Sequence, residues 1–434
     1  MTGGAPVSSR HSTIIVLCPH FAPDTAPTGT VMTRIVEELV ELGHCVHVVT
    51  SLPWYRSHAI EPGWGGRRRR IEHTPWGSIT RIDPFPGDNK SNLVRRALGF
   101  VAYSVLAGAA ALRVGDQRRV DAVIAMSPPL TLGLTGWMVA TWRGAPLIFN
   151  IQDVFPDAAV TTGAITNRWV ITAASWLERV SYRLSDAVTV LSDDLRANVV
   201  TKLPPARADT VHVIPNFVDT AAIAPGDRNT TYRRELGLGA GPVVMYAGNV
   251  GFSQSLDLVV AAAERLPDIQ FVINGEGAAR DALAASGAHL TNLHFAPYVD
   301  ADRLAELLAS ADLHVVPLRR GLGSVSVPSK TYSILAAGRP VVAAIDAGTA
   351  VPRILEASGG GTAVAPDEPD AFTAAIAELV ASPSTRAAMG LAGRSWVVAN
   401  ASPAAVGQRY SELIQALGAN RRRRGRPPGA GSGR

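Results

Sequence analysis

The sequence predicts an α/β protein built from two doubly wound domains, and three observations lead to this fold class. Short aliphatic runs alternate with longer helical patterns from one end of the chain to the other. The aliphatic runs are continuous, which is typical of parallel strands buried on both faces. A Pro- and Ala-rich segment at 202–209, followed by residues 214–226, separates two such series.

These patterns give the expected elements in order. Strands are expected at 13–18, 45–50, 122–126, 146–151, 187–191, 243–247, 269–273, 313–317 and 340–344. Helices are expected at 30–42, 255–266, 300–310, 369–381 and 403–417. The corresponding domains are residues 1–210 and 211–400. A helical segment at 401–418 follows, and the sequence leaves open which domain it packs on; packing back on the amino-terminal domain is one of the two alternatives. Residues 419–434 are expected to form a disordered basic tail.

Composition excludes several classes of protein. The chain has 434 residues, 47% of them hydrophobic, which is enough for two cores and excludes general disorder. The net charge of +5 comes from the tail: residues 421–434 hold six arginines and no acid, so the rest sums to about −1. A globally basic nucleic-acid binder is therefore excluded. Two cysteines, Cys18 and Cys45, cannot form a disulfide framework, and we expect a reducing, cytoplasmic location without a signal peptide.

The loop after the first strand reads HFAPDTAPTGT, residues 20–30. Small residues between a strand and a helix leave backbone N–H groups directed at a ligand beyond the helix N-terminus. The loop lacks the GxGxxG fingerprint of dinucleotide-binding proteins. An ordinary strand–helix loop with Thr30 as the helix cap is the alternative. The candidate binding residues are His20, Asp24, Thr28, Gly29 and Thr30.

Three glycine-bearing loops follow strands of the second domain, at 246–251, 274–277 and 321–324. Such loops allow close backbone approach, and in a parallel sheet they line one edge, which suits a diphosphate. Lys330, one of only three lysines, stands where a helix is expected to begin near Ser329. A cation there is unfavourable with the helix dipole unless an anion is present. The alternative is a solvated lysine at a helix end.

With these residues in view, the chain resembles the retaining glycosyltransferases of family 4. The resemblance rests on HFAPDTAPTGT, YAGNVGFSQSLD (246–257), NGEG (274–277), VPSKTYSILAAGRPVV (327–342) and a closing RYSEL helix (409–413). It runs from about residue 13 to residue 417, almost the whole chain. NIQDVFPDAAV (150–160) and SPPL (127–130) resemble the branch that builds cell-surface polysaccharides, often by transferring N-acetylated aminosugars.

The resemblance implies a GT-B fold, two Rossmann-like domains that face each other across a nucleotide-sugar cleft. It places the nucleotide-sugar on the carboxy-terminal domain and the acceptor on the amino-terminal one. No cofactor or metal is implied beyond the nucleotide-sugar co-substrate, for which a UDP-linked N-acetylated hexosamine is expected and GDP- or dTDP-sugars stay open. The expected donor-binding residues are Gly248, Asn249, Gln254, Glu276, Gly323, Ser324, Ser329, Lys330 and Ser333.

The sequence departs from the family pattern at the donor site. Many members carry Arg and Lys in the loop where this chain has Asn249 and Gln254. A pair of glutamates eight residues apart is also common, and the aligned positions here are Val325 and Ser333. Lys330 is therefore the expected charged contact to the diphosphate, with backbone amides around Gly323 and Ser324.

Asp153 follows the expected strand at 146–151, where a carboxylate would face the cleft and polarise an acceptor hydroxyl. Alternatively, Asp153 or Asp157 caps the turn that follows. Family members are thought to react by front-face attack, in which the departing diphosphate accepts the acceptor proton. Ser192, Asp193 and Asp194 are expected to begin a helix as an N-cap with acids in its first turn, not to bind a metal ion.

The function expected from this reasoning is transfer of a sugar from a nucleotide diphosphate to a lipid-linked or glycolipid acceptor in cell-surface polysaccharide synthesis. A nucleotide-sugar epimerase of the same fold and a non-catalytic nucleotide-sugar-binding subunit are the alternatives. An apolar segment at 97–112 with flanking arginines either lies peripherally on an anionic membrane or is a buried helix. No nucleic-acid partner is expected.

Overall fold

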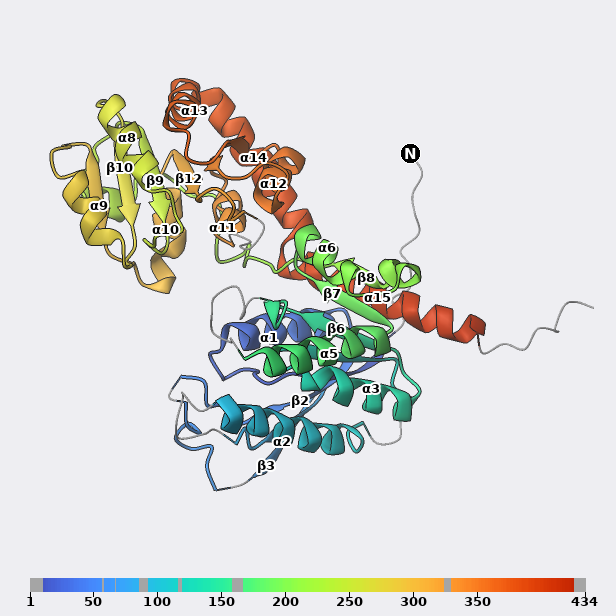
Figure 1. Ribbon diagram of the computed structural model, residues 1–434. Coiled ribbons are helices and arrows are strands. Elements are labelled where there is room, and N and C mark those ends of the chain that lie inside the picture. The colour runs from blue at the N-terminus through green and yellow to red at the C-terminus, as the bar shows by residue number, and fades with distance from the viewer. Residues whose placement is uncertain are drawn as a thin grey trace, which may run out of the picture. The chain divides into compact units, whose positions relative to one another are not determined.

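The computed structural model describes residues 11–56, 58–66, 68–85, 93–115, 119–157, 167–323 and 329–424. Two compact units divide the chain (Figure 1): Met1–Pro215 with Val406–Arg434, and Asn216–Ala405. Each unit contains one sheet, and the parallel α/β architecture predicted from the sequence is confirmed.

The first unit contains an eight-stranded sheet in the order β3-β4-β2-β1-β5-β6-β7-β8. All neighbouring strands are parallel except β3 and β4, which form an antiparallel pair at one edge. The strands are β1 (Thr13–Leu17), β2 (Cys45–Ser51), β3 (Arg69–Thr74), β4 (Gly77–Ile82), β5 (Ala122–Ser127), β6 (Leu147–Ile151), β7 (Ala187–Val190) and β8 (Val211–Val213). Since β8 pairs with β7, residues 211–213 belong to this unit, and the predicted domain boundary at 210 lies too early.

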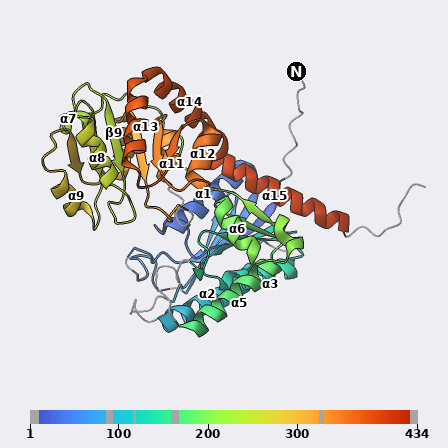
Figure 2. The ribbon, with the colours of Figure 1, turned by 45° about the horizontal axis from the view of Figure 1, so that its top comes forward.

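Helices cover both faces of this sheet. They are α1 (Pro27–Glu41), α2 (Leu93–Ala111), α3 (Thr131–Arg143), α5 (Arg168–Leu184), α6 (Asp193–Thr201), the 3-10 turn η1 (Pro205–Thr210) and α15 (Pro403–Arg424). Figure 2 shows α2, α3 and α5 on one side of the sheet and α1 and α15 on the other. Helix α6 lies on the side of α5, since its Val199 packs in the same buried layer as Phe149 and Tyr182. Ile15 and Leu17 of β1 pack in the buried layer beneath α2 and α3, together with Tyr103 and Leu132.

The closing helix α15 packs on the first unit. The Tyr410 hydroxyl accepts a hydrogen bond from the Asn150 side chain at 2.7 Å, and Ser411 is hydrogen-bonded to His44 at 2.8 Å. The helix continues through residues 419–424, so the predicted start of a disordered tail at 419 is wrong for those residues. Alanine and arginine are good helix formers, and after Pro403 no proline occurs before residue 427. The rest of the predicted tail lies outside the described residues.

The second unit contains a six-stranded parallel sheet in the order β11-β10-β9-β12-β13-β14. Its strands are β9 (Val243–Ala247), β10 (Gln270–Asn274), β11 (Leu293–Ala296), β12 (Leu313–Pro317), β13 (Val341–Ala344) and β14 (Gly361–Val364). Its helices are α7 (Thr231–Glu235), α8 (Asp257–Arg265), α9 (Arg280–Ser286), the 3-10 turn η2 (Ala301–Arg303) leading into α10 (Leu304–Ala309), α11 (Lys330–Ala336), α12 (Ala350–Ser358), α13 (Pro369–Ala381) and α14 (Pro383–Asn400).

The segment at 97–112 lies in α2 up to Ala111, where that helix ends, and it is neither fully buried nor fully exposed. Tyr103 and Ala107 are buried against the sheet, whereas Leu98 and Val105 face outward. Among the described residues, none of the helices is both long and apolar enough to pass through a bilayer.

Candidate functional site

The first two glycine loops of the second unit lie against each other at the carboxyl ends of β9 and β10. Gly248 N–H donates to the Asn274 carbonyl, and Val250 N–H donates to the Glu276 carbonyl, both at 2.9 Å. A Cβ at Gly275 would lie 1.9 Å from the Gly248 carbonyl oxygen, and one at Gly277 would lie 2.3 Å from that of Val250. The glycines are therefore required by close backbone approach.

We expect Gly275→Ala to destabilise the second unit, because it combines this backbone clash with a φ of +148°. The cost should be about 2 kcal/mol or more, seen as a lowered denaturation midpoint. Gly321→Ala is the matched control, since its φ is +85° but no heavy atom lies within 4 Å of the added Cβ. Equal losses in the two variants would show that backbone strain alone, and not loop packing, requires Gly275.

Lys330 is the first residue of α11, and its ammonium group lies beside these loops. Its Nζ donates to the Tyr246 hydroxyl at 2.9 Å and lies 4.0 Å from the centre of the Tyr246 ring. Within the described residues, it forms no ion pair with a carboxylate. Burial lowers the pKa of Lys330 to about 8. A partly desolvated cation without a counter-ion is the electrostatic environment that an anionic ligand stabilises.

Tyr246, at the carboxyl end of β9, holds this lysine in place. Its own hydroxyl donates to the Asn249 carbonyl at 2.5 Å, so the oxygen lone pair is left to accept from Lys330. Burial raises the pKa of this phenol, which keeps it a neutral donor. Tyr246 is not among the site residues predicted from the sequence, although its place at the end of a predicted strand, in the YAGNVG loop, was a usable signal.

A cavity of about 290 Å³ opens between these loops and α10 and α11. Gly248, Ser329, Lys330 and Ser333, all predicted donor-binding residues, line it. Its other wall is apolar and includes Leu304, Leu307 and Leu308, and the exposed ring of Tyr298 lies at its edge. Tyr298 follows β11, a strand that the sequence analysis did not predict.

Two other predicted donor residues, Gln254 and Glu276, have partners within the second unit. The Gln254 side-chain oxygen accepts from Gly251 N–H at 3.0 Å, so this side chain fastens its own loop. Glu276 pairs with Arg280 at 3.4 Å, and Asn249 is exposed.

The backbone amide of Gly323, a predicted contact to the diphosphate, has a partner within the second unit. The Gly323 N–H donates to the Asp346 carboxylate at 3.1 Å, and the Gly321 N–H donates to the same oxygen at 2.8 Å. The amide is therefore already satisfied by an acid that the sequence analysis had not singled out. Ser324, and Val325 with it, lies outside the described residues.

The HFAPD loop of the first unit is built around His20 and Asp24. The His20 Nδ1 lies 2.7 Å from Asp24 Oδ2, and the imidazole stacks on Trp54 with ring centres 5.6 Å apart. Asp24 is buried and also accepts from Tyr55 N–H at 3.2 Å. A Cβ at Gly29 would lie 2.8 Å from that of His20, so Gly29 lets α1 approach the loop.

The alternative interpretation of Thr30 as helix cap is wrong. Helix α1 begins at Pro27, with Ala26 in the N-cap position, and the Thr30 hydroxyl donates back to the Ala26 carbonyl at 3.3 Å. Proline is well suited to the first helical position because its fixed φ matches the helix. Thr28 and Thr30 therefore lie in the first turn of α1, which contains no acidic residue.

Arg81 of β4 is a positioning residue that the sequence analysis missed. Its buried guanidinium donates to the Phe21 and Ala22 carbonyls at 3.5 and 2.5 Å, and to Glu72 at 2.7 Å. It thereby fixes the backbone between His20 and Asp24. Arg81 lies far from the loop in the sequence and outside any strand expected from its pattern.

Asp153 is exposed just beyond the carboxyl end of β6, as the sequence analysis expected for that position. Asp157 instead accepts from Lys202 at 2.7 Å and from Asn198 at 3.0 Å. These hydrogen bonds outweigh the effect of burial and lower the pKa of Asp157. At the next strand, the Ser192 side chain accepts from Leu195 N–H, which confirms the predicted N-cap of α6.

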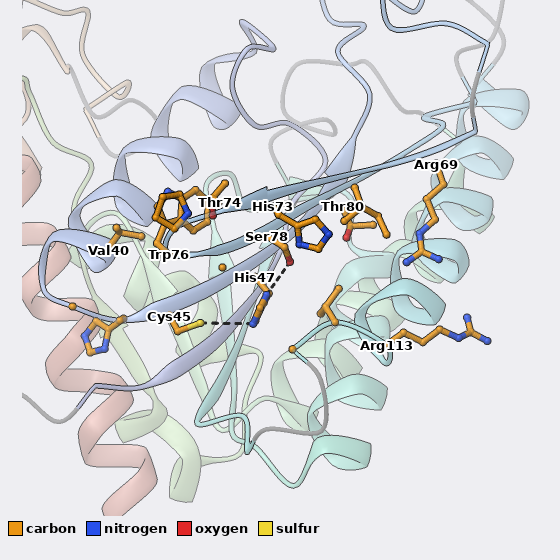
Figure 3. A pocket seen from close by; sticks show the side chains of 17 residues that line it. Val40, Cys45, His47, Arg69, His73, Thr74, Trp76, Ser78, Thr80 and Arg113 are labelled. Carbon is orange, nitrogen blue, oxygen red and sulfur yellow. Dashed lines mark hydrogen bonds between the residues drawn. The ribbon is translucent and has the colours of Figure 1, made fainter.

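A larger cavity, of about 810 Å³, lies in the first unit at the edge of the sheet opposite to the HFAPD loop and Asp153 (Figure 3). It adjoins the amino ends of β2 and β4, whereas ligands of doubly wound sheets bind at the carboxyl ends. Its polar side chains bond one another: His47 is 2.8 Å from the Ser78 hydroxyl and 3.7 Å from the Cys45 sulfur. None of the predicted site residues lines it.

In the described part of the chain, no three His, Cys, Asp or Glu side chains gather as metal ligands would.

Comparisons with known proteins agree with this organisation. A family model for the glycosyl transferase 4-like domain matches residues 28–216, and a model for glycosyl transferases group 1 matches residues 241–382. WcaI of Escherichia coli (strain K12), named as a glycosyl transferase of colanic acid biosynthesis, is 28% identical over 385 residues, which cover 85% of this chain and 92% of WcaI. A GDP-mannose-dependent alpha-(1-6)-phosphatidylinositol monomannoside mannosyltransferase of Mycolicibacterium smegmatis is 30% identical over 246 residues, 53% of this chain and 62% of that one.

Two solved structures share the fold over nearly the whole chain. Sucrose-phosphate synthase from Thermosynechococcus elongatus superposes with a TM-score of 0.67 at 18% identity, covering 94% of this chain and 100% of that one. HepE from Anabaena, solved with UDP and glucose, gives a TM-score of 0.61 at 15% identity with the same coverage.

Fold and comparisons together define the class: the protein is a glycosyltransferase with the GT-B fold. More particularly, it is a GT-B glycosyltransferase of the family 4 type, with a 4-like domain in the first unit and a group 1 domain in the second. The GT-B fold predicted from the sequence is confirmed, and the family prediction is confirmed as far as a family 4-type glycosyltransferase.

Proposed function

We propose that this enzyme is a retaining glycosyltransferase of cell-surface polysaccharide synthesis. It transfers an N-acetylated hexosamine from a UDP-sugar to a lipid-linked or glycolipid acceptor. The relation to WcaI, whose name places it in colanic acid biosynthesis, supports the pathway class. The structural likeness to HepE, which was solved with UDP, makes a UDP-linked donor the first candidate to test.

The observation that carries the proposal is the ammonium group of Lys330. It lies at a glycine-lined cavity, lacks a carboxylate partner among the described residues and has a pKa lowered by burial. A diphosphate would supply the missing negative charge and restore the pKa. As the donor bond breaks, negative charge grows on the leaving diphosphate, so a cation held there stabilises the transition state more than the ground state.

The positive charge beside the proposed diphosphate site is supplied by the side chain of Lys330. We therefore propose that the reaction requires neither a metal ion nor a cofactor. The departing diphosphate takes the acceptor proton in a front-face attack. A dedicated protein base is then unnecessary, and the first unit has only to bind and orient the acceptor. His20, Asp24 and Asp153, at the carboxyl ends of β1 and β6, are the groups we propose for that task.

Asp153→Asn is expected to lower the transfer rate by about tenfold to a hundredfold while UDP affinity stays within about twofold of wild type. The reason is that the carboxylate would contact the acceptor hydroxyl and not the nucleotide. Steady-state transfer kinetics with calorimetric titration of UDP measure both quantities. Asp157→Asn, whose carboxylate is already bound to Lys202, is the matched control for local structure. Wild-type turnover of Asp153→Asn would remove this residue from the acceptor site.

A nucleotide panel tests the function itself. Thermal stabilisation by UDP, and less by GDP, dTDP or CMP, with and without a divalent ion, would support the proposed donor class. GDP is the specific alternative, because the mycobacterial relative is named as GDP-mannose-dependent. Transfer from a labelled UDP-sugar to a lipid extract then separates a transferase from an epimerase, which needs no acceptor. Absence of any nucleotide response would contradict the proposal.

A further inference from the structure

The outer face of the first unit carries large apolar side chains on three neighbouring helices. Trp142 of α3 is 77% exposed, and Trp169 and Trp176 of α5 are 73% and 60% exposed. Leu98 and Val105 of α2 and Met138 of α3 are also mostly exposed. We call these six side chains the tryptophan face. Large exposed apolar patches on soluble domains mark interaction surfaces.

The three helices form one continuous layer, so the face is a single surface. A Cβ at Gly108 of α2 would lie 2.9 Å from the Thr135 side chain of α3. One at Gly133 of α3 would lie 2.5 Å from the Ser181 hydroxyl of α5. Small and hydroxylic residues thus bring the helices together on their inner sides, while the tryptophans point outward. Figure 2 shows α2, α3 and α5 side by side beneath the sheet.

The charges on these helices have one sign. Their sequences contain six arginines and one acid, Glu178. That acid is buried and bound to Lys202 at 2.7 Å and to the Tyr182 hydroxyl, so it presents no charge outward. The exposed arginines of α5 are Arg168, Arg179 and Arg183, and the Arg168 guanidinium lies 5.4 Å from the Trp169 ring centre. Outward-facing tryptophan beside arginine, without acids, is complementary to an anionic lipid surface.

We propose that the tryptophan face docks the enzyme on an anionic lipid bilayer. The indole rings enter the headgroup region, where a ring with an apolar body and a polar N–H is favoured, and the arginines bind lipid phosphates. The helices run antiparallel to the strands, so the amino end of α5, with Trp169, lies at the sheet edge that carries Asp153. This placement rests on the proposed function: it brings a lipid-linked acceptor to the edge where its hydroxyl is needed.

Vesicle binding tests the proposal with full-length protein. Co-sedimentation is measured with phosphatidylcholine vesicles and with vesicles that also contain phosphatidylglycerol, at low and high salt. Wild-type protein should bind the anionic vesicles, and binding should weaken with salt. The variant Trp142→Ser/Trp169→Ser/Trp176→Ser should bind at least about tenfold more weakly, since it loses the apolar area that enters the headgroup region. Leu391→Ser/Val398→Ser, which removes exposed apolar residues of α14, should bind as wild type.

A charge-reversal variant and three contrary outcomes complete the test. Arg168→Glu/Arg179→Glu/Arg183→Glu should lose the preference for anionic vesicles, with Arg265→Glu of the second unit as control. Failure of wild-type protein to bind anionic vesicles, or wild-type binding by the tryptophan variant, would overturn the proposal. Sedimentation showing that the tryptophan variant instead converts an oligomer to a monomer, without change in vesicle binding, would also overturn it and assign the face to a protein contact.

The donor site provides the readout that separates the two proposals. UDP binding by the tryptophan variant should equal that of wild type, because these side chains belong to the first unit and the proposed donor cavity to the second. If wild-type protein binds vesicles but no nucleotide, the proposed function fails and the docking surface stands. If it binds UDP but not vesicles, the docking surface fails and the proposed function stands.

Discussion

Lys330→Met should reduce UDP affinity by about tenfold to a hundredfold, the loss expected when a charge-assisted hydrogen bond to an anion is removed. The same variant should be more stable than wild type without ligand at neutral pH. Lys330 is a partly buried cation without a carboxylate partner among the described residues, and an apolar side chain of similar length removes that desolvation cost. Opposite changes in stability and affinity are characteristic of a functional residue that the fold alone does not favour.

The pKa of Lys330 gives this prediction a pH dependence with a definite sign. The folded-state pKa of about 8 lies below the ordinary value of 10.5, so the unfolded chain binds this proton more tightly. Stability should therefore rise as pH increases from about 8 to about 10.5, by at most about 3 kcal/mol. Subtracting the stability of Lys330→Met at each pH isolates this contribution from the tyrosines that titrate nearby. UDP affinity of the wild type should fall over the same range, as the ammonium loses its proton.

Two variants serve as controls. Lys330→Arg keeps the charge and should retain part of the affinity, whereas Tyr246→Phe removes the hydroxyl that fixes the ammonium and should weaken UDP binding by less than Lys330→Met. Calorimetric titration and urea unfolding supply both readouts. Unchanged UDP affinity in Lys330→Met would contradict the donor role of this residue, whatever happened to stability.

The parts of the donor site that could be predicted from sequence have short-range signatures. A glycine directly after a buried strand signals a loop at the carboxyl end of a parallel sheet, and Gly248 and Gly275 both follow that rule. Lys330 was found because lysines are rare in this chain and one at a helix start needs an explanation. These inferences require only local pattern and general sheet topology.

The parts that could not be predicted depend on contacts between distant segments. Gly323 has the loop signature of the other glycines, but its amide is satisfied by Asp346, which only the fold brings near. Arg81 reaches the HFAPD loop from β4, a strand whose mixed sequence GSITRI gives no continuous aliphatic run. Beside it, β3 reads RRIEHT and alternates between exposed and half-buried positions, as an antiparallel edge strand should. The search for continuous aliphatic runs therefore passes over this edge of the sheet.

The other large effect is expected at Lys202, in the first unit. This lysine is shared between Asp157, in the segment after β6, and the buried Glu178 of α5, at 2.7 Å from each. Lys202→Met would leave Glu178 charged and buried without its counter-ion, and within the described part of the chain the Tyr182 hydroxyl would be its remaining hydrogen-bond partner. We expect a loss of about 3–5 kcal/mol in the free energy of unfolding at neutral pH. Urea unfolding measures that loss.

The loss should shrink as pH is lowered, which distinguishes an uncompensated charge from a packing defect. Burial already raises the pKa of Glu178, and removing Lys202 takes away the interactions that oppose this rise. In the variant the carboxyl group therefore becomes neutral at a higher pH, and below that point it needs no counter-ion. Adding Glu178→Gln to Lys202→Met should recover most of the stability, because the amide oxygen can still accept from Tyr182. A loss that is equal at pH 7 and near pH 4, and that Glu178→Gln does not relieve, would show that Lys202 stabilises the unit by packing alone.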